Sequence, residues 1–270
     1  EFNIGITAGI ETTLASAQWL EGCNKMDLIL TSSTHSKNVL QNSTWTRKDG
    51  TVVKLTKPIE VLLEGVDLST YYKTNQIHQS VNQQLANIKE KFCFLFVGHW
   101  LPGDIGEDRK NVAMLVHLFL TAFKDKAARN QPALILKTSM IDFSPIDKEN
   151  LIKKLQQVYS TVTGNASGFP NVYLLHGDLE DEEINSLYNH PKVKAHISLT
   201  KGEGYGRPLA EAGTSQKPII ALNWSGHVDF LKHALTLPGT LTQVHPSASW
   251  DGVILREARW MTVNYGTVIA

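Results

Sequence analysis

From about residue 90 onward, short apolar runs alternate with segments whose apolar residues recur every three or four positions. A continuous apolar run at 92–97 ends in Gly98, which is typical of a strand buried on both faces of a parallel sheet. Asn111 precedes the first helical pattern and is a residue type that can cap a helix start. Strands are expected at 92–97, 133–136, 171–175, 193–199 and 218–222, and helices at 111–123, 147–162, 181–188, 207–214 and in a short segment ending at 231. This alternation predicts βαβ units and an α/β fold with a parallel sheet.

The flanking segments are patterned more weakly. Before residue 68, helices are expected at 12–24 and 33–40, strands at 26–30 and 59–63, and a turn at 48–50. These elements are too few to close a second α/β domain alone. The expected organisation is a partial N-terminal domain at 1–67, a polar linker with a surface helix at 68–90, the parallel-sheet domain at 91–235, and an unassigned tail at 236–270.

Composition excludes several function classes. The chain has 26 Lys plus Arg and 26 Asp plus Glu, so it lacks the basic excess of a nucleic-acid-binding protein. No apolar run reaches the roughly 18 residues that a membrane span needs. Two distant cysteines indicate a reduced, cytoplasmic protein, and the 10 histidines show no metal-ligand spacing, so no metal is expected. The chain opens without Met in strand-like sequence, and we expect that its true N-terminus is missing.

The segment at 201–213 carries the most chemistry. It follows an expected strand and opens an expected helix, and ligands of open α/β sheets bind at the carboxyl ends of strands. Its glycines allow a backbone to approach a ligand, and the free N–H groups of a helix start favour an anion such as a diphosphate. Glu203 and Glu211 could each accept hydrogen bonds from sugar hydroxyls. No structural duty for either glutamate is evident from the sequence.

This segment resembles the E-x7-E motif of the family-4 (group 1) retaining glycosyltransferases, usually E-G-F-G-L-P-x-x-E-A. The resemblance covers residues 4–232 and extends to three further strings: Phe96-Val97-Gly98 followed by Asp108-Arg109-Lys110-Asn111, Gln216-Lys217-Pro218-Ile219-Ile220-Ala221, and Ser225-Gly226-His227-Val228-Asp229. Three residues depart from the usual pattern: Arg207 replaces an apolar residue, Asp229 replaces Glu, and His99 replaces an Arg.

The resemblance implies a two-domain GT-B fold and a metal-independent, retaining hexosyltransferase without a cofactor. A nucleotide-diphosphate sugar would be the donor substrate, and a glycan or small molecule the acceptor. Arg109 and Lys110 would hold the leaving diphosphate, Glu203 the transferred sugar and Glu211 the ribose. Further donor-binding residues would be Gly202, Gly204, Tyr205, Gly206, Arg207, Pro208, Leu209 and Gly177, and Glu11 would lie on the acceptor side.

Two alternatives stay open at this point. A chain with only part of the acceptor half could bind a nucleotide-sugar and transfer nothing. A sugar-nucleotide epimerase would use the same fold and hold the same diphosphate, because fold alone does not set function.

Overall fold

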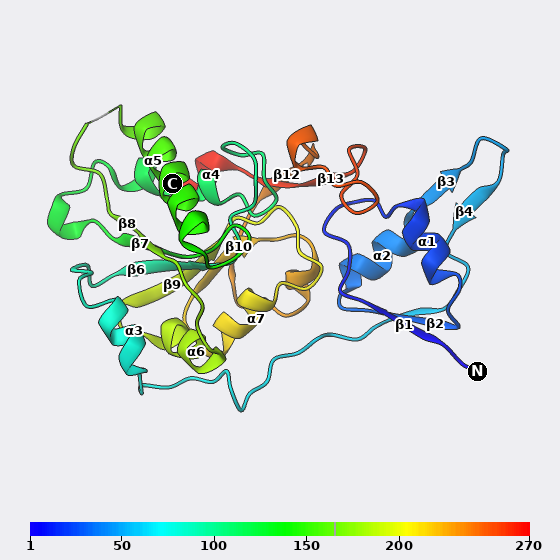
Figure 1. The fold of residues 1–270 in the computed structure, drawn as a ribbon, viewed down its shortest axis with the longest axis horizontal. Coiled ribbons are helices and arrows are strands. Elements are labelled where there is room, and N and C mark those ends of the chain that lie inside the picture. Colours follow the sequence, from blue (N-terminus) through cyan, green and yellow to red (C-terminus); the bar gives the residue numbers. More distant parts are fainter. Residues whose placement is uncertain (165) are drawn as a thin grey trace.

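Six parallel strands form the larger sheet of the computed structural model, which describes residues 1–164 and 166–270 (Figure 1). The strand order is β11-β10-β9-β6-β7-β8, and every neighbouring pair is parallel. The strands are β6 (Cys93–Val97), β7 (Ala133–Lys137), β8 (Val172–Leu175), β9 (Val193–Ser198), β10 (Ile219–Leu222) and β11 (Leu235–Leu237). The expected parallel α/β architecture is therefore confirmed.

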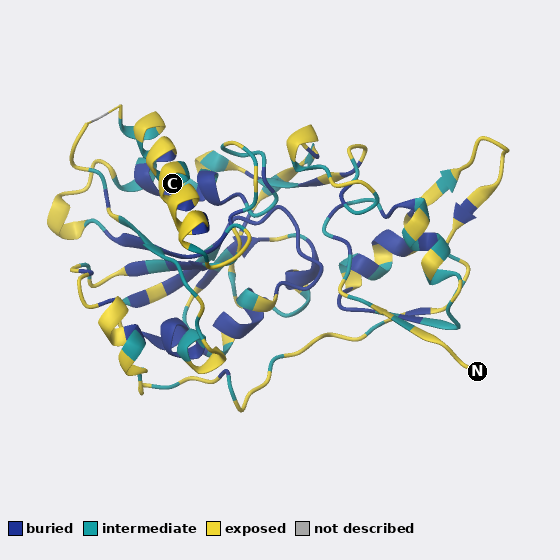
Figure 2. Ribbon diagram, in the orientation of Figure 1, coloured by how far each residue is buried: buried dark blue, intermediate teal, exposed yellow. Residues whose placement is uncertain are grey.

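Helices cover both faces of this sheet, which explains why most residues of its strands are apolar. The side chains of Leu95 and Ile135 pack beneath one helical layer, while their neighbours Phe96 and Leu134 pack beneath the other. Figure 2 shows the resulting band of buried residues along the sheet. The first layer contains α3 (Gln79–Gln84), α6 (Asp181–Asn189) and α7 (Arg207–Thr214), and the second α4 (Val112–Phe123), α5 (Pro145–Thr163) and α8 (Tyr265–Ile269).

The start of α4 differs from the expectation in one detail. Asn111 does precede the helix, but its backbone is left-handed, with φ 59°, and its side chain makes no capping hydrogen bond. Instead, its amide N–H donates to the Asp108 carboxylate at 2.7 Å. The prediction of a side-chain cap was wrong because Asp108, three residues earlier, turns the loop tightly before the helix.

The N-terminal unit has a small core of its own around a three-stranded parallel sheet, in the order β1-β2-β5. Its elements are β1 (Ile4–Thr7), α1 (Ala17–Cys23), β2 (Leu28–Thr31), α2 (Thr34–Asn42), the hairpin of β3 (Thr44–Thr46) and β4 (Val52–Lys54), and β5 (Ile59–Val61). The predicted turn at 48–50 closes the hairpin, with Gly50 at φ +86°.

Helix α1 begins at Ala17, five residues later than expected. The Ser16 hydroxyl caps it by accepting from the Trp19 amide. Residues 8–15 instead run along the larger domain, where the Thr13 amide donates to the Arg259 carbonyl at 2.9 Å. A tertiary contact therefore replaces the first turn of the expected helix.

The tail completes the larger domain. Leu235, at the expected boundary, opens the edge strand β11, which pairs with β10. The antiparallel pair β12 (Gly239–Gln243) and β13 (Arg259–Val263) follows, and the Trp260 side chain is buried in a separate apolar cluster. Short 3-10 helices lie at η1 (Ala128–Asn130), η2 (Gly226–Asp229) and η3 (Pro246–Ala248).

Candidate functional site

Glu203 lies in a buried cluster of charged side chains. Lys110 Nζ donates to its Oε1 at 2.5 Å, and Arg109 Nη1 donates to its Oε2 at 3.1 Å. The same guanidinium donates to the Gly202 carbonyl at 2.8 Å and lies 3.8 Å from the Glu11 carboxylate of the N-terminal unit. The loop after β6 carries the two cations and the loop after β9 carries Glu203, so neighbouring strands bring them together.

Burial and charge act in opposite directions on these groups. Burial opposes ionisation of Glu203, but Lys110 and Arg109 outweigh it and lower the carboxyl pKa to about 2. Burial likewise lowers the pKa of Lys110, and the Glu203 carboxylate opposes that shift. At neutral pH the glutamate is therefore ionised and paired with the two cations on the expected phosphate-binding loop.

Glu211 lies one helical turn into α7 and is also held by two side chains. Its Oε1 accepts from Arg207 Nε at 2.9 Å, and its Oε2 accepts from the Tyr188 hydroxyl at 3.1 Å. Burial raises the pKa of Glu211, and these two donors oppose the shift. Both glutamates thus have structural partners that the sequence did not reveal.

A cavity of about 410 Å³ opens at the carboxyl ends of β6 and β7, the edge of an open α/β sheet where ligands bind. Lys110 and Glu211 both line it, whereas Glu203 and Arg109 are not among its described lining residues. Its other walls come from the strand ends, the loop before α6, α7 and the linker: Tyr71, Val97, Gly98, His99, Lys137, Thr138, Ser139, Phe143, Asp178, Leu179, Asp181, Ile184, Arg207 and Pro208. A volume of this size suits a small-molecule ligand.

The glycines at 202 and 204 lie against protein rather than against this cavity. A Cβ at Gly202 would overlap the carbonyl oxygen of Glu11, and one at Gly204 would overlap that of Ala8. Residues 198–206 are buried without interruption, which is unusual for a loop, and the N-terminal unit supplies part of the cover. Here these two glycines permit contact between domains, not the close approach to a ligand that the sequence suggested.

The remaining expected site residues are placed in different ways. Gly206, at φ +99°, forms the turn into α7, and Pro208 in the first turn lines the cavity. Leu209 is buried in the core beneath the sheet, and the Tyr205 hydroxyl accepts from the Gly65 amide at 3.1 Å, in the segment before the linker. The Gly177 carbonyl accepts from the Lys137 ammonium at the cavity wall.

Sequence reasoning also missed Lys137 and Tyr71, which line the cavity, and Tyr188, which hydrogen-bonds Glu211 from behind it. Lys137 is the charged end of an otherwise apolar strand, a signal that could have identified it. Tyr71 lies in the polar linker but is buried, and its hydroxyl donates to Asp181 at 2.9 Å. Tyr188 supports Glu211 from α6, and no sequence pattern distinguishes it from a core aromatic residue.

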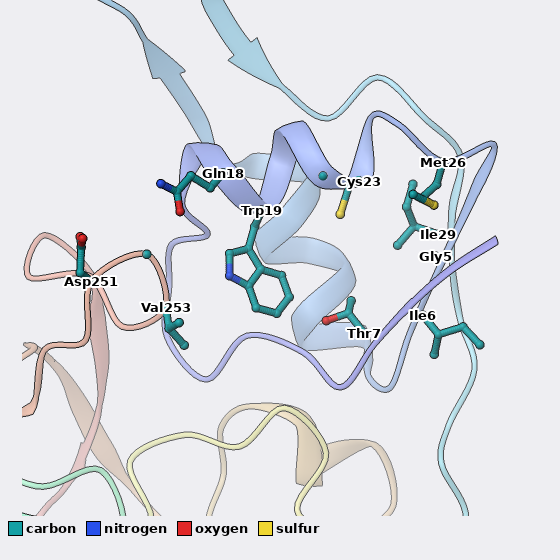
Figure 3. Close-up of a pocket in the computed structure, with 12 residues that line it drawn as sticks. Gly5, Ile6, Thr7, Gln18, Trp19, Cys23, Met26, Ile29, Asp251 and Val253 are labelled. Atoms are coloured by element: carbon teal, nitrogen blue, oxygen red, sulfur yellow. The ribbon is translucent and has the colours of Figure 1, made fainter. Parts of the chain in front are cut away.

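A second cavity, of about 460 Å³, lies beside α1 and β1 (Figure 3). Its wall is mainly apolar, with Trp19, Met26 and Ile29 from the N-terminal unit and Val253 from the tail. It shares no lining residue with the cavity that contains Lys110 and Glu211. The Lys110 ammonium and the Glu211 carboxylate in its wall make the strand-end cavity the candidate site.

Within residues 1–164 and 166–270, none of the helices combines the length and the apolar character that a membrane span requires. No group of three or more His, Cys, Asp or Glu side chains suited to a metal ion lies among those residues.

No protein-family model and no curated protein match this sequence. Solved structures match its fold. A trehalose-6-phosphate synthase aligns with a TM-score of 0.60 and 13% identity, over 87% of this chain and 55% of that one. Anabaena HepE in complex with UDP and glucose aligns with a TM-score of 0.55 and 17% identity, over 85% and 55%. A sucrose-phosphate synthase from Thermosynechococcus elongatus aligns with a TM-score of 0.55 and 16% identity, over 82% and 47%.

The chain has a GT-B fold. The likeness spans both α/β units, because it covers more than four fifths of the chain in each of these cases. This chain spans about half the length of the structures that it matches. At identities below a fifth, the likeness concerns the fold, and the chemistry must be argued from the site.

Proposed function

We propose that this chain is the donor-binding part of a retaining glycosyltransferase, which moves a sugar from a nucleoside diphosphate to an acceptor hydroxyl. The observation that carries the proposal is the strand-end cavity, with Lys110 and Glu211 in its wall and Glu203 directly behind Lys110. A cation for phosphate and a carboxylate for hydroxyls are the groups that a nucleoside diphosphate requires. Anabaena HepE, which shares the fold, binds UDP and glucose.

The proposed chemistry depends on charge that develops during the reaction. When the bond between the anomeric carbon and the diphosphate breaks, its electron pair stays on the phosphate oxygen. Lys110 and Arg109 would stabilise this charge from a buried site, where such interactions are strongest. In this proposal the protein itself supplies the positive charge, so no metal ion is required.

A second candidate is a nucleotide-sugar-binding module without transfer activity. It is favoured by one observation, that the chain spans about half the length of the transferases whose fold it shares. In that case the donor cavity would bind its ligand, but no acceptor would be glycosylated.

Two measurements test these proposals. In a thermal-shift panel with UDP, GDP, ADP and their glucose conjugates, the ligands of one base should raise the melting temperature. A ligand at 100 times its Kd adds about 2.7 kcal/mol to the free energy of unfolding. Product analysis with that nucleotide-sugar, an acceptor panel and added EDTA then separates transfer from binding. If none of the nucleotides stabilises the chain, both proposals are wrong; binding without any product would favour the module.

A further inference from the structure

The carboxylate of Glu211 is fixed before any ligand arrives. One oxygen accepts from Arg207 at 2.9 Å and the other from Tyr188 at 3.1 Å. An ionised carboxylate offers about four lone-pair sites, so each oxygen keeps roughly one further acceptor position. Because Glu211 lines the strand-end cavity, these positions are available to a ligand there.

The two donors approach from opposite environments. Tyr188 is 1% exposed, and its ring packs in the core beneath the sheet, edge-on to His196 at 5.3 Å. The Arg207 side chain is 68% exposed and lies at the cavity wall. The neighbouring Tyr71 is engaged elsewhere, because its hydroxyl donates to Asp181. Glu211 thus accepts hydrogen bonds from one buried donor and one exposed donor.

We propose that Tyr188 and Arg207 are positioning residues that aim Glu211 at the ribose diol, and thereby make the donor cavity selective for ribonucleotides. This inference rests on the proposed function. It assigns roles to a buried residue of α6 and to an arginine that stands where the resembled family has an apolar residue. Tyr188 contributes more than Arg207 to the positioning of Glu211, because its buried ring cannot move without disturbing the core.

The physical basis is a difference in free energy between two states of a buried carboxylate, one with all of its hydrogen bonds made and one with some of them missing. A ligand with both hydroxyls fills the two remaining acceptor positions of Glu211. A ligand without them buries the carboxylate against carbon, and its lost hydration is not replaced. Sites built to bind a hydroxyl therefore reject an analogue that lacks it. The rejection depends on a fixed carboxylate, since a free one could turn back to solvent.

The test is calorimetric titration of the chain with UDP, GDP and ADP, and with the 2′,3′-dideoxy analogue of the one that binds most tightly. We expect the wild-type chain to prefer the ribonucleotide at least about tenfold. Tyr188→Phe keeps the ring but removes the hydroxyl, and should lower this preference about 3- to 10-fold while leaving affinity for the dideoxy analogue within about twofold. Arg207→Gln should lower the preference for the ribonucleotide by less, because the Arg207 side chain is exposed.

Tyr159→Phe is the matched control. Tyr159 lies on α5, in the opposite helical layer. Its hydroxyl is also part-buried and hydrogen-bonded, but to the backbone of Pro170 and Val172. It should lower the melting temperature without changing the preference. Equal weakening of both ligands in Tyr188→Phe, or an unchanged preference in both Tyr188→Phe and Arg207→Gln, would overturn the inference while leaving the proposed function intact. A wild-type chain that binds no nucleoside diphosphate would overturn the proposed function itself.

Discussion

Glu203 contacts cations through both oxygens of its carboxylate. Lys110 and Arg109 come from a loop about 90 positions away, and together they hold the buried carboxyl in its charged form. A donor diphosphate near Lys110 would meet an ammonium that is already partly neutralised. At the scale of the residue, Glu203 and the phosphate groups of the proposed donor would compete for the same positive charge.

Replacing this carboxylate by an amide tests the competition. Glu203→Gln keeps the size of the side chain but removes the carboxylate that the two buried cations share, and Glu11 stays 3.8 Å from Arg109. We expect nucleoside diphosphate affinity to rise about tenfold, since a charge-assisted contact contributes roughly 1.5–3 kcal/mol. The ligand-free chain should lose about 3–5 kcal/mol of stability. Calorimetry and urea unfolding measure the two effects, and weaker nucleotide binding would show that Glu203 does not compete.

The same pair predicts an acid dependence of stability. Because the folded pKa of Glu203 lies at about 2, below its ordinary value of 4.5, its ionisation stabilises the fold above pH 4.5. That stabilisation, on the order of 3 kcal/mol, is lost as the pH falls toward 2. The stability difference between wild type and Glu203→Gln should therefore narrow from pH 5 to pH 3 in urea unfolding. A constant difference would contradict the assigned pair.

The two basic residues should behave differently when each is removed. Lys110 lines the cavity, whereas Arg109 links Gly202, Glu203 and Glu11 behind it. Lys110→Ala should weaken nucleoside diphosphate binding by roughly 1.5–3 kcal/mol and leave nucleoside binding unchanged. Arg109→Ala should affect nucleotide binding less and thermal stability more. Equal losses of nucleotide affinity would mean that both residues contact phosphate, as the sequence alone suggested.

At the scale of the element, the loop between β9 and α7 serves two partners. Its last residues turn into the helix through the left-handed Gly206, and Glu203 lies in its middle. The middle packs against residues 8–11 of the N-terminal unit at such short range that only glycine fits at 202 and 204. The Ser32 hydroxyl also donates to the Gly204 carbonyl across the domains, at 3.3 Å. This loop therefore connects the candidate site to the N-terminal unit.

A methyl group at position 204 should disturb the contact of this loop with the N-terminal unit and leave the nucleotide cavity unchanged. Gly204→Ala would push the Ala8 carbonyl away and displace the segment that carries Glu11. We expect nucleotide affinity within about threefold of wild type, because no cavity-lining atom changes, together with a large loss of transfer or of acceptor binding. Gly213→Ala is the control, since its Cβ would meet only Ile219 at 3.8 Å. Unimpaired transfer in Gly204→Ala would mean that the contact between Gly204 and Ala8 does not set the relative position of the two units.

At the scale of the whole molecule, the two α/β units are joined by more than their linker. Figure 1 shows that residues 8–15 and the loops next to β12 and β13 lie between them. The Asp229 carboxylate accepts from the Thr34 amide at 2.7 Å, so the larger domain supplies an acceptor to the first turn of α2. The first amides of a helix lack partners inside it, and a negative charge there is favourable.

This contact predicts that one domain stabilises a helix of the other. Asp229→Ala should remove about 0.5–2 kcal/mol from α2 locally, the usual contribution of a helix-start acceptor. Hydrogen exchange should accelerate in α2, while amides of β6 and β7 in the larger sheet keep their rates. Uniform acceleration would indicate global destabilisation, and unchanged exchange in α2 would indicate that the contact is absent in solution.

The sequence by itself determined the larger domain. The apolar runs at 92–97 and 133–136 were correctly predicted as strands. The helix predicted at 207–214 was also correct, and it begins after the left-handed Gly206 with Pro208 in its first turn. Local patterns suffice there because periodicity and turn residues are properties of neighbouring positions. For the same reason the position of the candidate site, at the carboxyl ends of the strands, followed from the order of elements.

Only the tertiary structure decided what the site residues contact. The pairing of Glu203 with Lys110 joins residues 93 positions apart, and the support of Glu211 by Tyr188 joins residues 23 apart. The glycines at 202 and 204 suggested a ligand, but they face Glu11 and Ala8, because the N-terminal unit folds back onto this loop. Partners that are distant along the chain leave no periodic signal at either position, so the sequence can name the charged groups but not which of them neutralise one another.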